Sequence, residues 1–236
     1  MSASSSAAQA LAHVHARIAH ACREAQRPST MVKLLAVSKR HGPEQVRALY
    51  AAGQRAFGEN YVQEGIQKQA ALADLPDIVW HLIGPLQSNK SRIAAEHFDW
   101  VQSIDRLSIA ERLSRQRPAH MPPLNVCVQV NVSGEASKSG VAPSEALALV
   151  KQVRALPRLV LRGLMTLPAP DIEPAALRAQ FDQLAALFNE VRHQNPEWVD
   201  WDTLSMGMSD DLEIAIAAGS TLVRVGTALF GARPKD

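Results

Sequence analysis

Short apolar runs alternate with amphipathic stretches along almost the whole chain. Such runs predict buried strands when they are brief and end near Gly, Pro or polar residues. The pattern gives eight strand candidates, at Leu34–Val37, Ala56–Phe57, Ile78–Ile83, Trp100–Ile104, Leu124–Val132, Leu159–Thr166, Thr203–Met206 and Leu222–Gly226. We therefore expect strands and helices to follow one another in repeated order.

The stretches between these runs have helical spacing and helical end signals. Pro43, Pro143 and Pro174 can each occupy the first turn of a helix, and Gly53 can end one. The segment Asp210–Ala218 is followed by Gly219, which predicts a further helix end. An extra helix at about residues 5–26 is predicted by four apolar residues on one helical face, at Leu11, Val14, Ile18 and Cys22.

Eight strands that alternate with helices predict a parallel sheet, and a chain of 236 residues suits a closed (β/α)8 TIM barrel. The alternative is an open, doubly wound sheet. Its dinucleotide-binding version is excluded because no GxGxxG motif follows the first strand candidate. We expect a single α/β domain over residues 1–236, in which the helix at about 5–26 precedes the barrel.

Charge and composition narrow the class of protein. The chain has 25 Lys and Arg against 23 Asp and Glu, interleaved along its length, with only 5% aromatic residues, which argues against nucleic-acid binding. It shows no secretory signal and no apolar run of about 18 residues, so we expect a cytoplasmic protein that does not bind membranes. Cys22 and Cys127 lie far apart and are expected to be buried thiols. The histidines lack metal-ligand spacing, so no metal site is expected.

The ends of the strands are where a barrel of this kind carries its function. Lys39 follows the first strand candidate, with Ser38 between them. It is either a surface lysine or a partly desolvated amine at the barrel mouth, whose lowered pKa would let it attack an aldehyde. Ser209 and the pair Gly226–Thr227 follow the last two strands, a place where barrels often bind phosphate. Ser209 can instead be only the cap of the helix at Asp210, and Gly226 only a tight turn.

Arg224 lies within the apolar run TLVRVG and shares the strand period of Leu222 and Gly226. If Leu222 points into the barrel, Arg224 does so too. An inward arginine requires a partner, which is either a carboxylate in a structural ion pair or a ligand. Three further residues are candidates for the same mouth or for purely structural roles, namely Asn60, His81 and Met165.

Seven motifs in a fixed order also carry a family resemblance. They are AVSK, FGENYVQE, WHLIGPLQSNK, VQSID, VNVSGEASKSGV, RGLMT and SMGMSDDLEIAIAAGSTLVRVGTALFG. Together, from about Leu34 to Gly231, they resemble the pyridoxal phosphate homeostasis proteins, whose fold is the N-terminal barrel of alanine racemase.

The resemblance implies pyridoxal 5'-phosphate (PLP) as the cofactor, with Lys39 as the Schiff-base lysine. It implies that Ser209, Gly226 and Thr227 hold the phosphate and that Arg224 faces the pyridine nitrogen. A permanently charged arginine there disfavours the pyridinium form, so the ring becomes a weaker electron sink. The other residues implied to lie around the cofactor are Asn60, His81, Met165 and Met206.

The resemblance implies a monomeric carrier or buffer of vitamin B6 that delivers PLP to apo PLP-dependent enzymes and does not turn over a substrate. The residues agree, because alanine racemase adds a second domain with a catalytic tyrosine and this chain offers only Tyr50 and Tyr61. Two alternatives remain, a PLP-dependent racemase or decarboxylase of amino acids, and a barrel that uses Lys39 on a sugar phosphate like a class I aldolase. The second lacks an obvious acidic proton shuttle beside Lys39.

Overall fold

The structure is a computed structural model that describes residues 3–135, 138–169 and 172–231. The remaining positions of the expected domain 1–236 lie outside the described residues. Among them are residues 136–137 of the VNVSGEASKSGV motif.

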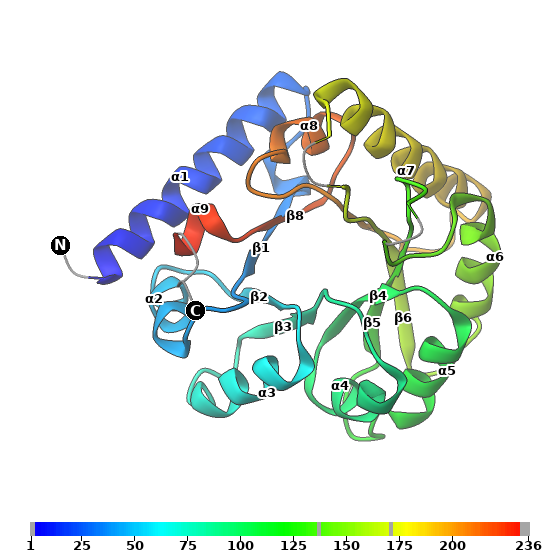
Figure 1. The fold of residues 1–236 in the computed structure, drawn as a ribbon, viewed down its shortest axis with the longest axis horizontal. Helices are drawn as coiled ribbons and strands as arrows, with labels where there is room; N and C mark the ends of the chain where they lie inside the picture. Colours follow the sequence, from blue (N-terminus) through cyan, green and yellow to red (C-terminus); the bar gives the residue numbers. More distant parts are fainter. Residues whose placement is uncertain (1–2, 136–137, 170–171, 232–236) are drawn as a thin grey trace.

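Eight parallel strands form a closed barrel in which each strand pairs with the next and β8 pairs with β1 (Figure 1). This confirms the predicted TIM barrel and excludes the open sheet. The strands are β1 (Lys33–Val37), β2 (Ala56–Glu59), β3 (Val79–Leu82), β4 (Trp100–Ile104), β5 (Leu124–Gln129), β6 (Leu159–Met165), β7 (Thr203–Ser205) and β8 (Leu222–Val225). Every strand candidate is therefore a strand, with ends shifted by a few residues at most.

The helices lie around the outside of this barrel (Figure 1). They are α1 (Ala3–Glu24), α2 (Pro43–Ala51), α3 (Val62–Ala71), α4 (Ser91–His97), α5 (Leu107–Gln116), α6 (Pro143–Arg154), α7 (Pro174–Gln194), α8 (Leu212–Ala217) and α9 (Thr227–Phe230), with short 3-10 helices at Ser29–Met31 and Ser88–Lys90. The three proline signals are confirmed, since α2, α6 and α7 each begin at the proline.

The start of α8 corrects one expectation. The helix begins at Leu212 and not at Asp210, and Asp211 is the residue that flanks it. A turn precedes the helix, in which the carboxylate of Asp211 accepts a hydrogen bond from the backbone N–H of Met208. Ser209 therefore does not cap α8, and its hydroxyl is left to interact elsewhere.

Successive strand residues face opposite sides of the sheet, as the strand period requires. The main hydrophobic core lies between sheet and helices and includes Leu204 and Met206. Inside the barrel the apolar groups are small, one around Leu35 and Leu222 and another around Trp100 and Met165. Polar side chains fill most of the rest of the interior, and such side chains can take part in binding or catalysis.

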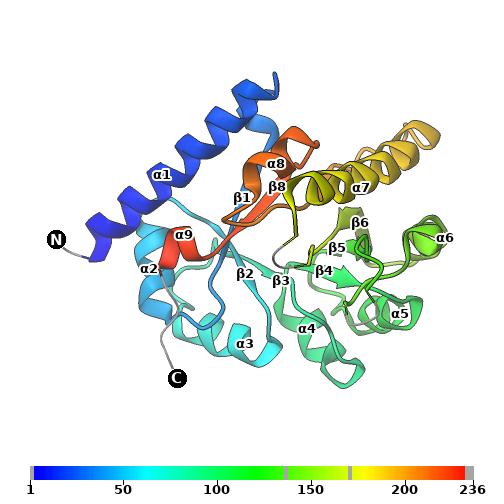
Figure 2. The ribbon, with the colours of Figure 1, turned by 45° about the horizontal axis from the view of Figure 1, so that its top comes forward.

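Helix α1 is the extra helix predicted before the barrel, and it packs against α2, α8 and α9 (Figures 1 and 2). Its apolar face is buried as expected, at Leu11, Val14, Ile18 and Cys22. Helix α9 has only four residues, so α1 provides the cover that a longer helix after β8 would give.

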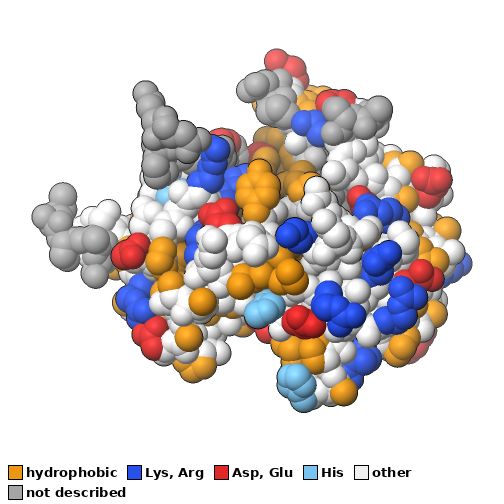
Figure 3. Space-filling view, turned by 60° about the horizontal axis from the view of Figure 1, so that its bottom comes forward, with side chains coloured by type: hydrophobic (Ala, Val, Ile, Leu, Met, Phe, Trp, Pro, Cys, Tyr) orange, Lys and Arg blue, Asp and Glu red, His pale blue; other side chains and the backbone are white. Residues whose placement is uncertain are grey.

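No helix within the described ranges is long and apolar enough to cross a membrane. On the face shown in Figure 3, Lys and Arg side chains lie between Asp and Glu side chains, and no continuous basic surface covers it.

Candidate functional site

A pocket of about 300 Å³ opens at the carboxyl ends of the strands. Six of the residues singled out from the sequence line it, and they come from four different strand ends: Lys39, Asn60, Ser209, Arg224, Gly226 and Thr227. The site thus brings an amine, a guanidinium, a hydroxyl and glycine backbone to one small volume.

Lys39 extends from the end of β1 and is half-buried. A polar cluster beneath it, formed by Ser38, Glu59, Glu64 and Lys68, holds the two residues beside it. The Lys68 ammonium donates to the Ser38 carbonyl at 2.5 Å, to Glu59 at 2.7 Å and to Glu64 at 2.8 Å. The Ser38 hydroxyl also donates to Glu59.

The next residue, Arg40, has a φ of +65°, which is uncommon for a residue other than glycine. Its backbone N–H donates to Glu64 at 2.5 Å. Contacts on both sides therefore fix the segment that carries the Lys39 amine. Burial raises the pKa of Glu59 above its usual value, although the charge of Lys68 opposes that shift.

Arg224 lies inside the barrel, 2% exposed, as the strand period from Leu222 predicts. One terminal nitrogen donates to the Ser205 hydroxyl at 2.7 Å and the other to the Thr166 carbonyl at 2.7 Å. Its Nε has no hydrogen-bond partner among the described residues, and none of the described ion pairs includes Arg224. Burial lowers the pKa of Arg224 to about 10, so the side chain stays charged at neutral pH. Among the described residues the structure therefore shows no ion pair for Arg224, which is a buried cation in the lining of the pocket.

The loops after β7 and β8 form the wall of the pocket that lies next to β1. The Ser209 hydroxyl accepts a hydrogen bond from the Gly226 N–H at 3.3 Å. A side chain at Gly226 would lie 3.3 Å from the Val37 carbonyl, so the turn passes close to β1.

Arg17 of α1 holds this wall from outside. It donates to the Ser209 carbonyl at 2.9 Å and to Glu213 of α8 at 2.8 Å. Arg27 donates to the carbonyls of Ile216 and Ser220 at the other end of α8. The sequence pattern gives no signal for either contact, since each joins residues about 190 positions apart.

The position of Asn60 depends on a close approach between two backbone segments, one after β2 and one after β3. A Cβ added at Gly84 would lie 2.0 Å from the Asn60 carbonyl oxygen, so only glycine fits there. The WHLIG motif therefore supports Asn60 through Gly84 and lines the pocket with Ile83.

Three predicted residues do not line the pocket. Met206 faces the helices, because it has the parity of Leu204 on β7 and not that of Ser205. Met165 and His81 face the barrel interior but lie below the pocket, where His81 stacks on Trp100 at 4.9 Å between ring centroids. The pocket instead includes six residues not singled out before, namely Val37, His41, Ile83, Leu167, Met208 and Asp210. His41 is fixed by stacking on Phe230, a contact without sequence signal.

His81 gives the barrel interior a measurable pH signature. Burial, together with the charges of Lys33 and Arg162, lowers its pKa from 6.5 to about 3. Below pH 6.5 the unfolded chain therefore binds a proton that the folded chain does not, so stability falls as the pH drops toward 3. At pH ~5 the free energy of unfolding is therefore lower by about 2 kcal/mol.

We expect His81→Asn to remove most of this acid sensitivity, because asparagine has no proton to gain. Urea unfolding at neutral and mildly acidic pH measures it. His97→Asn, at an exposed histidine, is the control. Equal pH dependence in both variants would refute the assignment.

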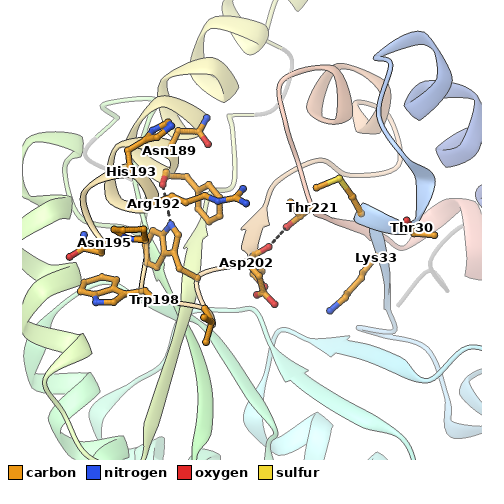
Figure 4. A pocket seen from close by; sticks show the side chains of 15 residues that line it. Thr30, Lys33, Asn189, Arg192, His193, Asn195, Trp198, Asp202 and Thr221 are labelled. Atoms are coloured by element: carbon orange, nitrogen blue, oxygen red, sulfur yellow. Dashed lines mark hydrogen bonds between the residues drawn. The ribbon is translucent and has the colours of Figure 1, made fainter.

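A larger cavity of about 710 Å³ lies at the other end of the barrel (Figure 4). It is formed where α7 ends and β1, β7 and β8 begin, and Lys33, Arg192 and His193 are among its lining residues. None of the predicted site residues lines it. Since barrels of this architecture place their chemistry at the carboxyl ends of the strands, the smaller pocket is the candidate site.

The barrel and its rim define a known class of protein. Residues 10–234 match the family described as "Alanine racemase, N-terminal domain". Solved alanine racemases share the fold at low identity; one from Corynebacterium glutamicum is 16% identical with a TM-score of 0.63, over 94% of this chain and 62% of that chain.

Much nearer relatives specify the family. A protein of Pseudomonas aeruginosa named "Pyridoxal phosphate homeostasis protein" is 58% identical, covering 97% of this chain and 96% of the relative. One of the same name from Escherichia coli K12 is 52% identical, covering 94% and 95%. The structure of PipY from Synechococcus elongatus "with PLP bound" is 42% identical, with a TM-score of 0.82 over 95% of this chain and 100% of that chain. This chain belongs to the pyridoxal phosphate homeostasis protein family.

Proposed function

We propose that this protein binds PLP through a Schiff base on Lys39 and carries or buffers the cofactor in PLP homeostasis. The observation that supports this best is that the Lys39 amine shares one pocket with Ser209, Gly226, Thr227 and Arg224. A phosphorylated aldehyde needs an amine at one end and anion-binding groups at the other. Lys39 lies at the end of β1 and Ser209 after β7, so the rim offers both.

The buried guanidinium of Arg224 indicates whether the pocket residues suit PLP. Arg224 has a donor, Nε, without a partner among the described side chains and backbone groups. An orphaned buried donor is costly, and a heteroaromatic nitrogen is a suitable acceptor. Arg224 would hold the ring nitrogen, while Ser209 and the turn Gly226–Thr227 would hold the phosphate.

When bound, PLP supplies an aldehyde that condenses with an amine, and an electron-withdrawing ring. The protein's part is to place the Lys39 amine at one side of the pocket and a positive charge at the ring nitrogen. Since Arg224 remains charged at neutral pH, it disfavours a proton on that nitrogen and weakens the ring as an electron sink. That arrangement supports binding without efficient turnover.

Trapping on the purified protein tests the assignment. After incubation with PLP, borohydride reduction and peptide mapping, we expect one modified residue, Lys39. Pyridoxine 5'-phosphate, which lacks the aldehyde, is expected to leave no adduct. An adduct elsewhere, or none, would overturn the proposal.

Separate measurements test the carrier role. We expect the loaded protein to reactivate apo PLP-dependent enzymes, and not to turn over alanine or ornithine faster than free PLP. Failure to transfer the cofactor, together with unchanged B6 vitamers in a deletion strain, would oppose it.

Arg17 should influence retention of the cofactor although it lies outside the pocket. In Arg17→Ala the Ser209 carbonyl loses its donor from α1, so the phosphate wall becomes less fixed. We expect the cofactor to dissociate several-fold faster, as for a hydrogen bond worth about 1 kcal/mol at a partly exposed site. Stopped-flow dilution measures the rate. Arg23→Ala, on the exposed side of the same helix, is the control, and equal rates in both would exclude this role.

A further inference from the structure

A chain of four buried polar side chains crosses the interior of the barrel. It begins at Arg224 on β8, continues to Ser205 on β7 and Gln102 on β4, and ends at His81 on β3. The distances are 2.7 Å from Arg224 to the Ser205 hydroxyl, 2.6 Å from that hydroxyl to Gln102 Oε1, and 3.0 Å from Gln102 Nε2 to His81 Nδ1. Each of the four is at most 3% exposed, so the chain is isolated from solvent.

The direction of the hydrogen bonds in this chain follows from the arginine at one end and from the orientation of the Gln102 amide, whose Oε1 faces Ser205 and whose Nε2 faces His81. An arginine can only donate, so the Ser205 oxygen accepts. The single Ser205 proton is then donated to Gln102 Oε1, which turns the Gln102 amide nitrogen toward His81. His81 must accept at Nδ1 and carry its proton on Nε2, which requires a neutral ring.

These bonds determine how the Arg224 guanidinium is held. One anchor, the Thr166 carbonyl, belongs to backbone that is itself fixed, since the Thr166 N–H donates to the Ser205 carbonyl at 3.1 Å. The other anchor is a hydroxyl that could rotate. Gln102 restricts that rotation, because its Oε1 accepts a hydrogen bond from the Ser205 hydroxyl. A lone pair of the Ser205 oxygen is then directed toward Arg224.

We infer that Gln102 is a positioning residue that acts through Ser205 to hold Arg224 against the ring nitrogen of the cofactor. This rests on the proposed function, since it concerns the same pocket. Gln102 itself is not among the residues that line the pocket. Its effect must therefore reach the ligand through Arg224.

The ring nitrogen distinguishes this role from ordinary packing. In the 1-deaza analogue of PLP a C–H group replaces that nitrogen, while the aldehyde and phosphate remain. A loosened barrel would weaken binding of both compounds. Misplacement of Arg224 would weaken binding of PLP alone.

The experiment measures dissociation constants for PLP and for 1-deaza-PLP with the full chain. We expect Gln102→Leu to weaken PLP binding about tenfold, as for one charged hydrogen bond, and 1-deaza-PLP binding less than about twofold. Ser205→Ala, a smaller change that guards against misfolding, should give the same selective loss. The double variant should be no worse than either single one.

Gln129→Leu is the matched control, because Gln129 is a buried barrel glutamine that bonds to the Ser139 carbonyl and not to this chain. Equal losses for both compounds, or a Gln102→Leu effect no larger than the control's, would overturn the inference alone. If the wild type forms no reducible adduct at Lys39, the proposed function fails and this inference with it.

Discussion

Lys39→Ala is expected to abolish the reducible adduct with PLP completely while the barrel remains folded. The adduct requires a primary amine, and alanine provides none. Because Lys39 is half-buried at the rim and outside the hydrophobic clusters, its loss should change stability little. Absorbance of the bound cofactor before reduction and mass spectrometry after it give the result.

A second substitution separates charge from amine chemistry. Lys39→Arg keeps a positive charge at the rim, but its guanidinium should form no adduct, so we expect the same loss. Lys151→Ala, at an exposed lysine of α6, should be labelled at Lys39 like the wild type. Persistent labelling of the Lys39 variants would show that another amine takes the aldehyde.

Lys68→Met is expected to destabilise the fold by about 3–5 kcal/mol at neutral pH, because it leaves a buried carboxylate without its cation. Glu59 is fully buried, and Lys68 is its ion-pair partner at 2.7 Å. Burial already raises the pKa of Glu59, and loss of Lys68 raises it further. The defect should therefore shrink as the pH falls and Glu59 takes up a proton, and grow as the pH rises.

Two comparisons check the origin of this effect by urea unfolding. Glu59→Gln combined with Lys68→Met should recover much of the loss, since no charge is then buried alone. Arg178→Met breaks an ion pair whose side chains are 47% and 50% exposed, and should cost less than about 0.5 kcal/mol. A Lys68→Met cost no larger than that of Arg178→Met would contradict the assignment.

Local periodicity was sufficient to predict the barrel and half of the site. The position of Lys39 just after a strand follows from the short apolar run before it, and the inward position of Arg224 follows from alternation along one strand. The same parity argument places Met206 on the outer face once Ser205 is known to face inward, but nothing local decides which face of a three-residue strand is which.

Other features depend on contacts between distant segments. The alternative that Ser209 caps the helix at Asp210 was wrong, because the Asp211 carboxylate accepts the backbone hydrogen bond in the short turn before α8. The anchoring by Arg17 and the chain from Arg224 to His81 join residues far apart in sequence. Strand order brings them together, so periodicity alone cannot predict them.

The placement of α1 also constrains how the protein is made. Arg17 contacts Ser209, which lies 192 residues further along the chain, and β1 pairs with β8. During synthesis the first helix and strand leave the ribosome long before these partners exist. The pairing of β1 with β8 and the contact between Ser209 and Gly226 are therefore completed together, only after β8 has emerged. The pocket at the barrel rim therefore forms only once nearly the whole chain has been synthesised.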